Sequence, residues 1–292
     1  MNNIIINDFL PVEISELGAE LQSIKDNEGN EYLWQGDEKY WNGKAPNIFP
    51  YVARLTEKKY TLFGNTYSMG THGFARNSVF EAEQISDTEV VFTLCETPET
   101  LKQYPYNFCF KVGFKLEGNR LVNTFYVKNN DEKVMYCGLG GHPGFNVPFE
   151  ENTEFDDYYL EFENKEVPLQ VVFSDDCYVL GKQPYKLDGG NKLPLYHSLF
   201  DNDAIVLENA GQTVTLKSKN GKKAIKAYFP DMRYIGFWHR ERSDAPYVCI
   251  EPWFSLPSRK GIIEDFEKQE GLLKLEKNKE YKTEISFEII GI

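Results

Sequence analysis

Apolar and polar residues alternate with a period of two along much of this 292-residue chain. Between residues 108 and 116 every second residue is apolar, and two lysines lie among the residues between them. Near the end of the chain, Thr283, Ile285, Phe287 and Ile289 repeat this spacing. Because successive side chains of a strand point to opposite faces, these segments predict strands with one buried face.

Turn signals separate the alternating segments. Gly118-Asn119 lies between two of them and predicts a tight hairpin. Gly64-Asn65 and Asn220-Gly221 predict two further hairpins. Helical signals are few: residues 97–105 and 261–269 each predict one short helix.

Strand signals run evenly from one end of the chain to the other, without repeats or a Ser/Gly-rich linker. Hydrophobic residues make up 41% and aromatic residues 15%, which is enough for a sizeable core and favours strands. The simplest interpretation is an all-β protein, a large antiparallel β-sandwich that spans residues 1–292 as one domain. Two stacked β domains are the alternative.

Charge and cysteine usage restrict the partners. A net charge of −13 disfavours nucleic acid and anionic membranes, whereas a neutral sugar or a protein is not disfavoured. The five cysteines include no C-x-x-C pair, so they predict neither a disulfide framework nor a zinc knuckle. Without a signal peptide or a run of about 20 apolar residues, we expect a cytoplasmic protein, either a monomer or a weak homodimer.

Two of the four histidines lie in glycine-containing segments. His142 is in "GLGGHPGFNVP", which has four glycines and two prolines, and His72 is in "THGFARN". Such segments favour a backbone shaped around a functional side chain over an ordinary surface or core histidine. His197 and His239 have ordinary neighbours, so we interpret them as surface or core residues.

A carboxylate lies on a largely apolar strand in "YVCIEPW". Alternation puts Tyr247, Cys249 and Glu251 on one face. A buried carboxylate is either paired or has a raised pKa, and a general base needs such tuning. Trp253 follows closely, and an aromatic ring suits the apolar face of a sugar. The ordinary alternative is a strand-end glutamate in water.

Two more segments offer groups for a polar ligand. Arg54 follows an apolar run, and its rigid donors suit ring and hydroxyl oxygens. In "FDNDAIVL", Asp201 or Asp203 can accept hydrogen bonds from sugar hydroxyls. The ordinary explanations are a surface ion pair for Arg54 and a turn before a strand for the aspartates.

The order of these segments resembles the aldose 1-epimerase (galactose mutarotase) family, especially its LacX-like branch. The matching stretches are "IFPYVARL", "THGFARN", "GGHPGFNVP", "FDNDAIVL" and "CIEPWFSLP". The resemblance covers nearly the whole chain and implies a large antiparallel β-sandwich with the site in a concave cleft.

The resemblance also implies roles for five residues. Glu251 would be the general base and His142 the general acid, with Arg54 and His72 close to the ring oxygen. Asp203 would hold the sugar hydroxyls. The reference pKa values of Glu and His, about 4.3 and 6.5, predict an ionised base and a protonated acid near neutral pH.

The implied reaction interconverts the α and β anomers of an aldohexose such as galactose or glucose, with no metal and no cofactor. Ala53 precedes Arg54 where better-studied members have asparagine, so the sugar stays open. One alternative is a hexose 6-phosphate mutarotase, for which Arg54, Arg76 and Lys44 are candidate phosphate ligands.

Three other kinds of protein stay open. The first is a sugar-binding protein without turnover. The second is a metal enzyme with His72, His142 and Glu251 as ligands. The third is a glycosidase that uses Asp203 and Glu251 as its two carboxylates.

Overall fold

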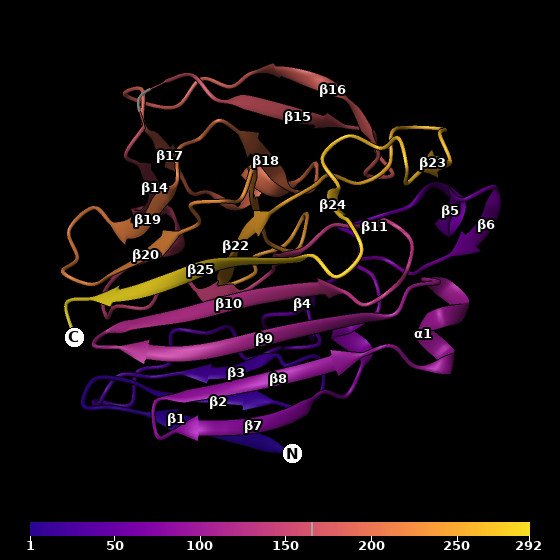
Figure 1. Cartoon of the computed structure of the whole chain (residues 1–292). Coiled ribbons are helices and arrows are strands. Elements are labelled where there is room, and N and C mark those ends of the chain that lie inside the picture. Colours follow the sequence, from indigo (N-terminus) through magenta and orange to yellow (C-terminus); the bar gives the residue numbers. More distant parts are fainter. Residues whose placement is uncertain (165) are drawn as a thin grey trace.

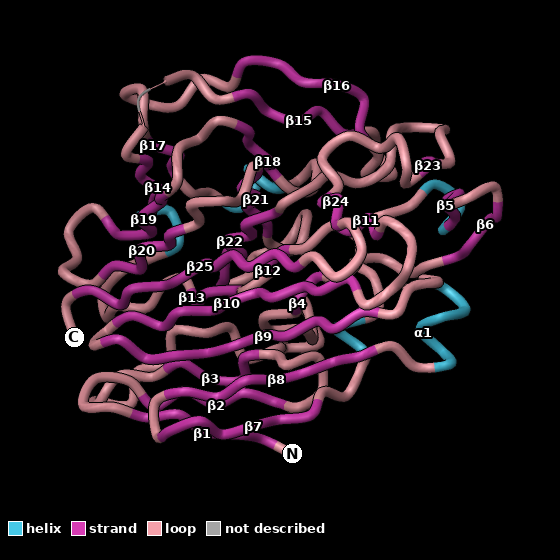
Figure 2. Tube along the Cα trace, in the orientation of Figure 1, coloured by secondary structure: helices cyan, strands magenta, loops and turns pink. Residues whose placement is uncertain are grey.

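Two large antiparallel sheets, of nine and eight strands, form most of the computed structural model, which describes residues 1–164 and 166–292 (Figures 1 and 2). The nine-stranded sheet contains, in spatial order, β17 (Lys192–Pro194), β14 (Tyr158–Phe162), β19 (Thr213–Ser218), β20 (Ala224–Tyr228), β25 (Glu280–Ile290), β10 (Arg120–Asn129), β9 (Phe108–Glu117), β8 (Glu89–Cys95) and β7 (Glu81–Ser86). The eight-stranded sheet contains β16 (Val179–Pro184), β15 (Leu169–Phe173), β18 (Ile205–Glu208), β21 (Tyr234–Trp238), β22 (Tyr247–Trp253), β12 (Gly140–Gly141) and β4 (Asn47–Ile48), with β13 (Gly144–Asn146) paired to β22.

Smaller sheets and short helices complete the described chain. The smaller sheets are β1 (Asn2–Ile6) with β2 (Pro11–Ser15) and β3 (Leu21–Ile24); β23 (Glu264–Asp265) with β5 (Lys59–Leu62) and β6 (Asn65–Ser68); and β11 (Met135–Cys137) with β24 (Leu273–Leu275). The helices are α1 (Pro98–Gln103), at one end of the long strands in Figure 1, and the 3-10 turns η1 (Thr56–Lys58), η2 (Ala75–Asn77), η3 (Phe155–Asp157) and η4 (His197–Phe200). Within the described ranges, no helix has the length and apolar character needed to span a membrane.

The buried faces of the two large sheets share one core. The predicted apolar face of β9 is buried, as is the face of β25 that carries Ile285 and Phe287. Across the core, the ring of Phe287 lies 5.0 Å from that of Phe145 on β13. Val248 and Ile250 of β22 join the same core. The sandwich prediction is therefore confirmed, and β22 is covered on both faces.

Local predictions had mixed outcomes. The helix over 97–105 is confirmed as α1, and the Thr97 side chain caps its first turn. The β9–β10 hairpin turns at Gly118-Asn119 as predicted. The β5–β6 hairpin turns one residue earlier than predicted, because Leu62 pairs with Asn65. Asn220-Gly221 lies in a wider loop between β19 and β20.

The second predicted helix, over 261–269, was wrong. This segment forms β23 and turns, because tertiary contacts outweigh its helix propensity. The ring of Phe266 stacks between Tyr51 and Tyr60, at centroid distances of 5.3 and 3.8 Å. The buried Glu264 is held by Arg259.

Candidate active site

One cavity of about 250 Å³ brings together Arg54, His72, His142, Asp203 and Glu251. Its volume lies below the roughly 300–1,000 Å³ of pockets for drug-sized ligands and suits a single sugar ring. Five segments that are far apart in the sequence thus contribute to one site. The sequence left open whether Asp201 or Asp203 faces the site and whether Lys44 does. Asp203 lines the cavity, whereas Asp201 and Lys44 do not.

Glu251 is fixed by the middle strands of the eight-stranded sheet. It lies on β22, opposite Gly236 of β21, and is only 1% exposed. Tyr247 and Cys249 lie on the same face of β22 and pack with Trp34, apart from the main core. The predicted alternation therefore holds, and the carboxylate is buried.

His142 is positioned by the glycines that precede it. Gly140 lies between β22 and β4, and a Cβ there would be 2.6 Å from the carbonyl oxygen of Pro252. A Cβ on Gly141 would be 2.8 Å from Ile285. At Gly140 the neighbour is backbone, so only glycine permits such close approach there. The His142 amide then donates to the carbonyl of Pro46, at 3.1 Å.

His142 and Glu251 form a buried pair. The distance between His142 Nε2 and Glu251 Oε2 is 3.2 Å. His142 Nδ1 and Glu251 Oε1 are also buried and have no hydrogen-bond partner among the described residues. Because buried polar atoms are usually satisfied, these two atoms mark the place where a ligand would make hydrogen bonds.

Burial disfavours charge on both members of this pair. It raises the pKa of Glu251 well above its ordinary value, and the Asp203 carboxylate adds to this effect. It lowers the pKa of His142 to about 3. In the protein alone, burial therefore favours the neutral forms, a protonated carboxyl beside a neutral imidazole. Burial thus opposes the ionised base and protonated acid that the reference pKa values predict, because desolvation penalises the charged form of each group.

His72 offers a defined hydrogen-bond donor. Its ring Nδ1 accepts from the backbone N–H of Ala53, at 3.3 Å, and the backbone N–H of His72 donates to the carbonyl of Ala53, at 2.9 Å. Burial keeps the pKa of His72 well below its ordinary value, so the ring is neutral. With Nδ1 acting as acceptor, Nε2 carries the hydrogen.

The Asp203 carboxylate is oriented by its neighbours. Oδ1 accepts from the backbone N–H of Ala204, at 2.7 Å, and Oδ2 accepts from the thiol of Cys177. Burial raises the pKa of Cys177 to about 12, so the thiol keeps its hydrogen for this contact. Cys177 lines the cavity, and no pattern in the sequence pointed to it.

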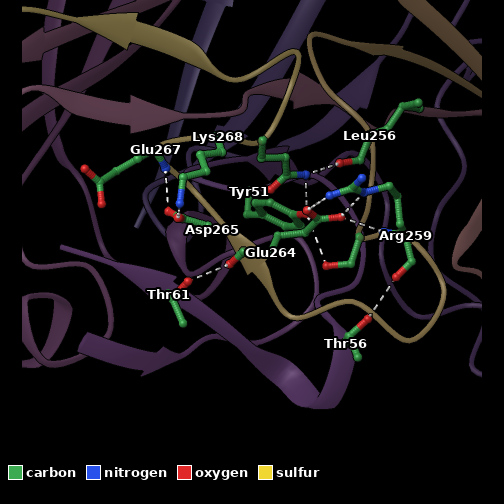
Figure 3. A network of polar contacts seen from close by, with 11 residues as sticks. Tyr51, Thr56, Thr61, Leu256, Arg259, Glu264, Asp265, Glu267 and Lys268 are labelled. Carbon is green, nitrogen blue, oxygen red and sulfur yellow. Dashed lines mark hydrogen bonds and ion pairs between the residues drawn. The ribbon is translucent and has the colours of Figure 1, made fainter. Parts of the chain in front are cut away.

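A polar network fixes the loop that follows β22 (Figure 3). Arg259 binds Glu264 through two nitrogens, at 3.0 and 2.9 Å, and Gln269 donates to the hydroxyl of Tyr51, at 2.7 Å. The amide of Ser258 in this loop donates to the carbonyl of Arg54, at 2.9 Å. The network therefore holds the backbone of a cavity residue.

Four residues of the cavity wall have left-handed backbone angles. The φ values are 55° at Ala53, 62° at His72, 64° at Cys177 and 74° at Asp203. Non-glycine residues rarely take this conformation, and it concentrates at functional sites where the surrounding structure enforces it. Gly73, at 73°, is next to His72, and a Cβ there would be 2.2 Å from the carbonyl oxygen of Phe49.

A potential metal-binding group overlaps this pair. Ligand-type atoms of His142, Cys249 and Glu251 lie within 4.8 Å of one another. Burial raises the pKa of the Cys249 thiol well above its ordinary value, and a protonated thiol is a poor ligand. The predicted set of His72, His142 and Glu251 is not the group that the geometry forms, since His72 Nδ1 already accepts a hydrogen bond.

Aromatic residues complete the cavity wall. The rings of Trp41 and Trp238 lie 5.0 and 5.8 Å from that of His142, and Trp253 is a third indole in the wall. Of these three tryptophans, the sequence predicted a role in the site only for Trp253, because of its position beside Glu251.

His197 and His239 form a pair next to Trp238. They agree with their interpretation as ordinary surface or core residues. His239 is fully buried and lies 3.3 Å, Nε2 to Nδ1, from His197. Neither His239 nor His197 lines the cavity.

Comparisons with known proteins agree with this fold. The family model described as "Aldose 1-epimerase" matches residues 3–288. The chromosomal protein LacX of Lactococcus lactis subsp. lactis is 34% identical over 272 residues, which cover 89% of this chain and 90% of LacX.

Solved structures give the same result. A galactose mutarotase related enzyme from Lactobacillus acidophilus superposes with a TM-score of 0.94 at 32% identity, covering 99% of this chain and 97% of that one. A galactose mutarotase-like protein from Lactobacillus casei gives 0.93 at 33% identity, covering 99% and 100%. The fold is thus the galactose mutarotase-like sandwich, typical of isomerase-type enzymes. The chain belongs to the aldose 1-epimerase family.

Proposed function

We propose that this protein is an aldose 1-epimerase that opens and recloses the ring of an aldohexose, such as galactose or glucose, and so interconverts its anomers. The main observation behind this proposal is the 3.2 Å contact between His142 and Glu251 in a cavity of monosaccharide size. Both groups transfer protons, and each keeps one unpartnered atom for the sugar.

In the proposed reaction, Glu251 takes the proton from the C1 hydroxyl while His142 gives a proton to the ring oxygen. The bond between C1 and the ring oxygen breaks, and the aldehyde turns about its bond to C2. Closure on the other face reverses both transfers. Each general acid or base typically contributes about 10²–10⁴-fold to the rate.

The pKa directions show which protonation state of the pair the bound sugar must favour. Before ring opening the pair must be ionised, with carboxylate and imidazolium. After ring opening Glu251 carries the proton and His142 is neutral. This neutral pair is the form that burial favours in the protein alone. Hydrogen bonds from sugar hydroxyls to the carboxylate would favour the ionised starting state.

The remaining groups would hold the sugar while it turns. His72 Nε2–H and the Arg54 guanidinium are donors for sugar oxygens, and the Asp203 carboxylate is an acceptor for hydroxyls. Holding the open chain in a reactive geometry is a large part of such catalysis.

Polarimetry of freshly dissolved α-D-glucose and α-D-galactose tests the proposal. The wild type should speed mutarotation, and Glu251→Gln and His142→Asn should each lower kcat by about 10²–10⁴-fold. Glu241→Gln is the control, because this cavity carboxylate lies outside the pair. Full activity of Glu251→Gln would remove the base assignment. Sugar binding in calorimetry without faster mutarotation would instead favour a sugar-binding protein without turnover.

A further inference from the structure

The turn between β15 and β16 forms part of the wall of the proposed sugar cavity. The backbone N–H of Cys177 donates to the carbonyl of Ser174, at 2.8 Å, and closes this turn. The Cys177 side chain lines the cavity together with Asp203, which lies in a different connection, just before β18. The acid–base pair does not explain why a thiol stands at this place in the wall.

The thiol of Cys177 completes a pair of contacts that hold the Asp203 carboxylate. It donates to Oδ2, while the backbone N–H of Ala204 donates to Oδ1, at 2.7 Å. A carboxylate has about four lone-pair sites, two on each oxygen, so one donor on each oxygen leaves both able to accept again. The two contacts thus fix the carboxylate by both oxygens and still leave acceptor capacity for a ligand.

The protonation state of Cys177 suits this role. Burial raises the pKa of its thiol to about 12, and the hydrogen bond to Asp203 adds to this effect. At neutral pH the sulfur therefore keeps its hydrogen and acts as a donor. Because a thiol is a weak donor, it orients the carboxylate without greatly weakening it as an acceptor for hydroxyls.

The turn that carries Cys177 is itself held in place. The backbone N–H of Val179 donates to the carbonyl of Ser258, and the backbone N–H of Lys260 donates to the carbonyl of Val179, both at 3.0 Å. The Lys260 side chain also binds the carboxylate of Asp176, at 2.5 Å. Since the turn is anchored on both sides of Cys177, the thiol reaches the cavity from a fixed position.

We infer that Cys177 is a positioning residue that sets the affinity for the sugar, by holding the Asp203 carboxylate in the orientation in which it accepts from sugar hydroxyls. A ligand is expected in this cavity on separate grounds, because His142 and Glu251 each have a buried, unpartnered atom there. Cys177 acts through Asp203 and exchanges no proton with the sugar. The inference rests on the ring-opening function proposed above.

Mutarotation kinetics of two variants test this role, with whichever of D-galactose and D-glucose the wild type converts faster. Cys177→Ala removes the donor and should raise KM about 5- to 50-fold. It should leave kcat within about threefold, because Asp203 holds the sugar alike in the ground state and the transition state. Cys177→Ser keeps a hydroxyl donor and should recover most of the lost affinity.

The two replacements are well matched. Neither alanine nor serine is β-branched, so both tolerate the left-handed backbone of Cys177 to a similar degree. Cys109→Ala is the control, because this thiol is also partly buried but does not line the cavity, and its KM should equal that of the wild type. A serine variant with no better affinity than the alanine variant would overturn the inference.

A double-mutant cycle shows whether Cys177 acts through Asp203. In the Asp203→Ala background, the further change Cys177→Ala should alter KM less than about twofold, because the group that the thiol positions is already absent. Equal losses of affinity in both backgrounds would overturn the inference.

Infrared spectroscopy and calorimetry separate this inference from the proposed function. The S–H stretching band that disappears in Cys177→Ala should move to the frequency of an unbonded thiol in Asp203→Ala; an unmoved band would refute the contact. If the wild type binds the sugar without faster mutarotation and Cys177→Ala weakens that binding, the ring-opening function fails and the positioning role stands. If the wild type speeds mutarotation and Cys177→Ala has the same KM, the positioning role alone fails.

Discussion

Replacing Glu251 with glutamine should make the protein more stable while it removes activity. In the unfolded chain, a glutamate ionises near pH 4.3. In the folded protein, burial raises the pKa of Glu251, so the carboxyl keeps its proton to higher pH. Above about pH 4.3 the folded wild type thus binds one proton more than the unfolded chain, and its free energy of unfolding falls as pH rises.

The size of the effect follows from this linkage. One proton of difference corresponds to about 1.4 kcal/mol per pH unit. Glutamine keeps the shape and does not titrate, and His142 titrates in both proteins, so its contribution largely cancels in the difference. The stability of Glu251→Gln relative to the wild type should therefore grow by about 1.4 kcal/mol per pH unit, from pH 4.3 up to the folded pKa of Glu251. In a chain of this size that corresponds to about 2–3 °C in Tm per pH unit.

Thermal unfolding of both proteins between pH 4.5 and 8, followed by circular dichroism, measures this difference. Glu208→Gln is the matched control, because Glu208 is also buried. Burial alone would raise its pKa, but hydrogen bonds from Lys182 and Arg233 outweigh burial and lower it. Its carboxylate therefore stabilises the protein at neutral pH, and Glu208→Gln should be less stable than the wild type. A Tm difference for Glu251→Gln that does not change with pH would refute the reasoning.

Two further predictions concern the backbone and the cysteines. Gly73 and Gly64 have similar φ values, 73° and 75°, but a Cβ on Gly73 would be 2.2 Å from the carbonyl of Phe49, whereas Gly64 faces open space. In urea unfolding, Gly64→Ala should cost about 1–2 kcal/mol and Gly73→Ala about 2–5 kcal/mol; equal costs would contradict the close-approach argument. Cys95 and Cys109 are directly opposed on the outer face of β8 and β9, where Cα separations of about 4.5–5.5 Å fall within the range of disulfides. Oxidised glutathione should join these two thiols while it is reduced to two glutathione thiols, and the new loop should add about 3 kcal/mol of stability; both thiols remaining open to alkylation would contradict this.

Local patterns predicted the fold to a large extent. Alternation in residues 108–116 and 283–289 depends only on which face of a strand is buried, so it survives in the folded protein. The segment 261–269 could not be assigned in this way. Its outcome depends on the stacking of Phe266 and on the pairing of Glu264 with Arg259, which are contacts between distant parts of the chain.

The site was predicted through family resemblance more than through chemistry. Glycines around His142 and the apolar strand of Glu251 indicated unusual positions, but no local pattern shows that the two side chains lie 3.2 Å apart. The direction of their pKa shifts needs burial in three dimensions and could not follow from reference values. Arg240 and Cys177 carried no sequence signal, and the single-domain assignment over residues 1–292 stays a prediction.

The left-handed residues of the cavity wall limit how this site can change its specificity. At Ala53, His72, Cys177 and Asp203 the backbone strongly disfavours β-branched side chains, whatever sugar would profit from them. Evolution or design is therefore directed to cavity residues with ordinary backbone angles, such as Thr71. A library restricted to positions of that kind should yield folded variants far more often than one that varies the four left-handed residues.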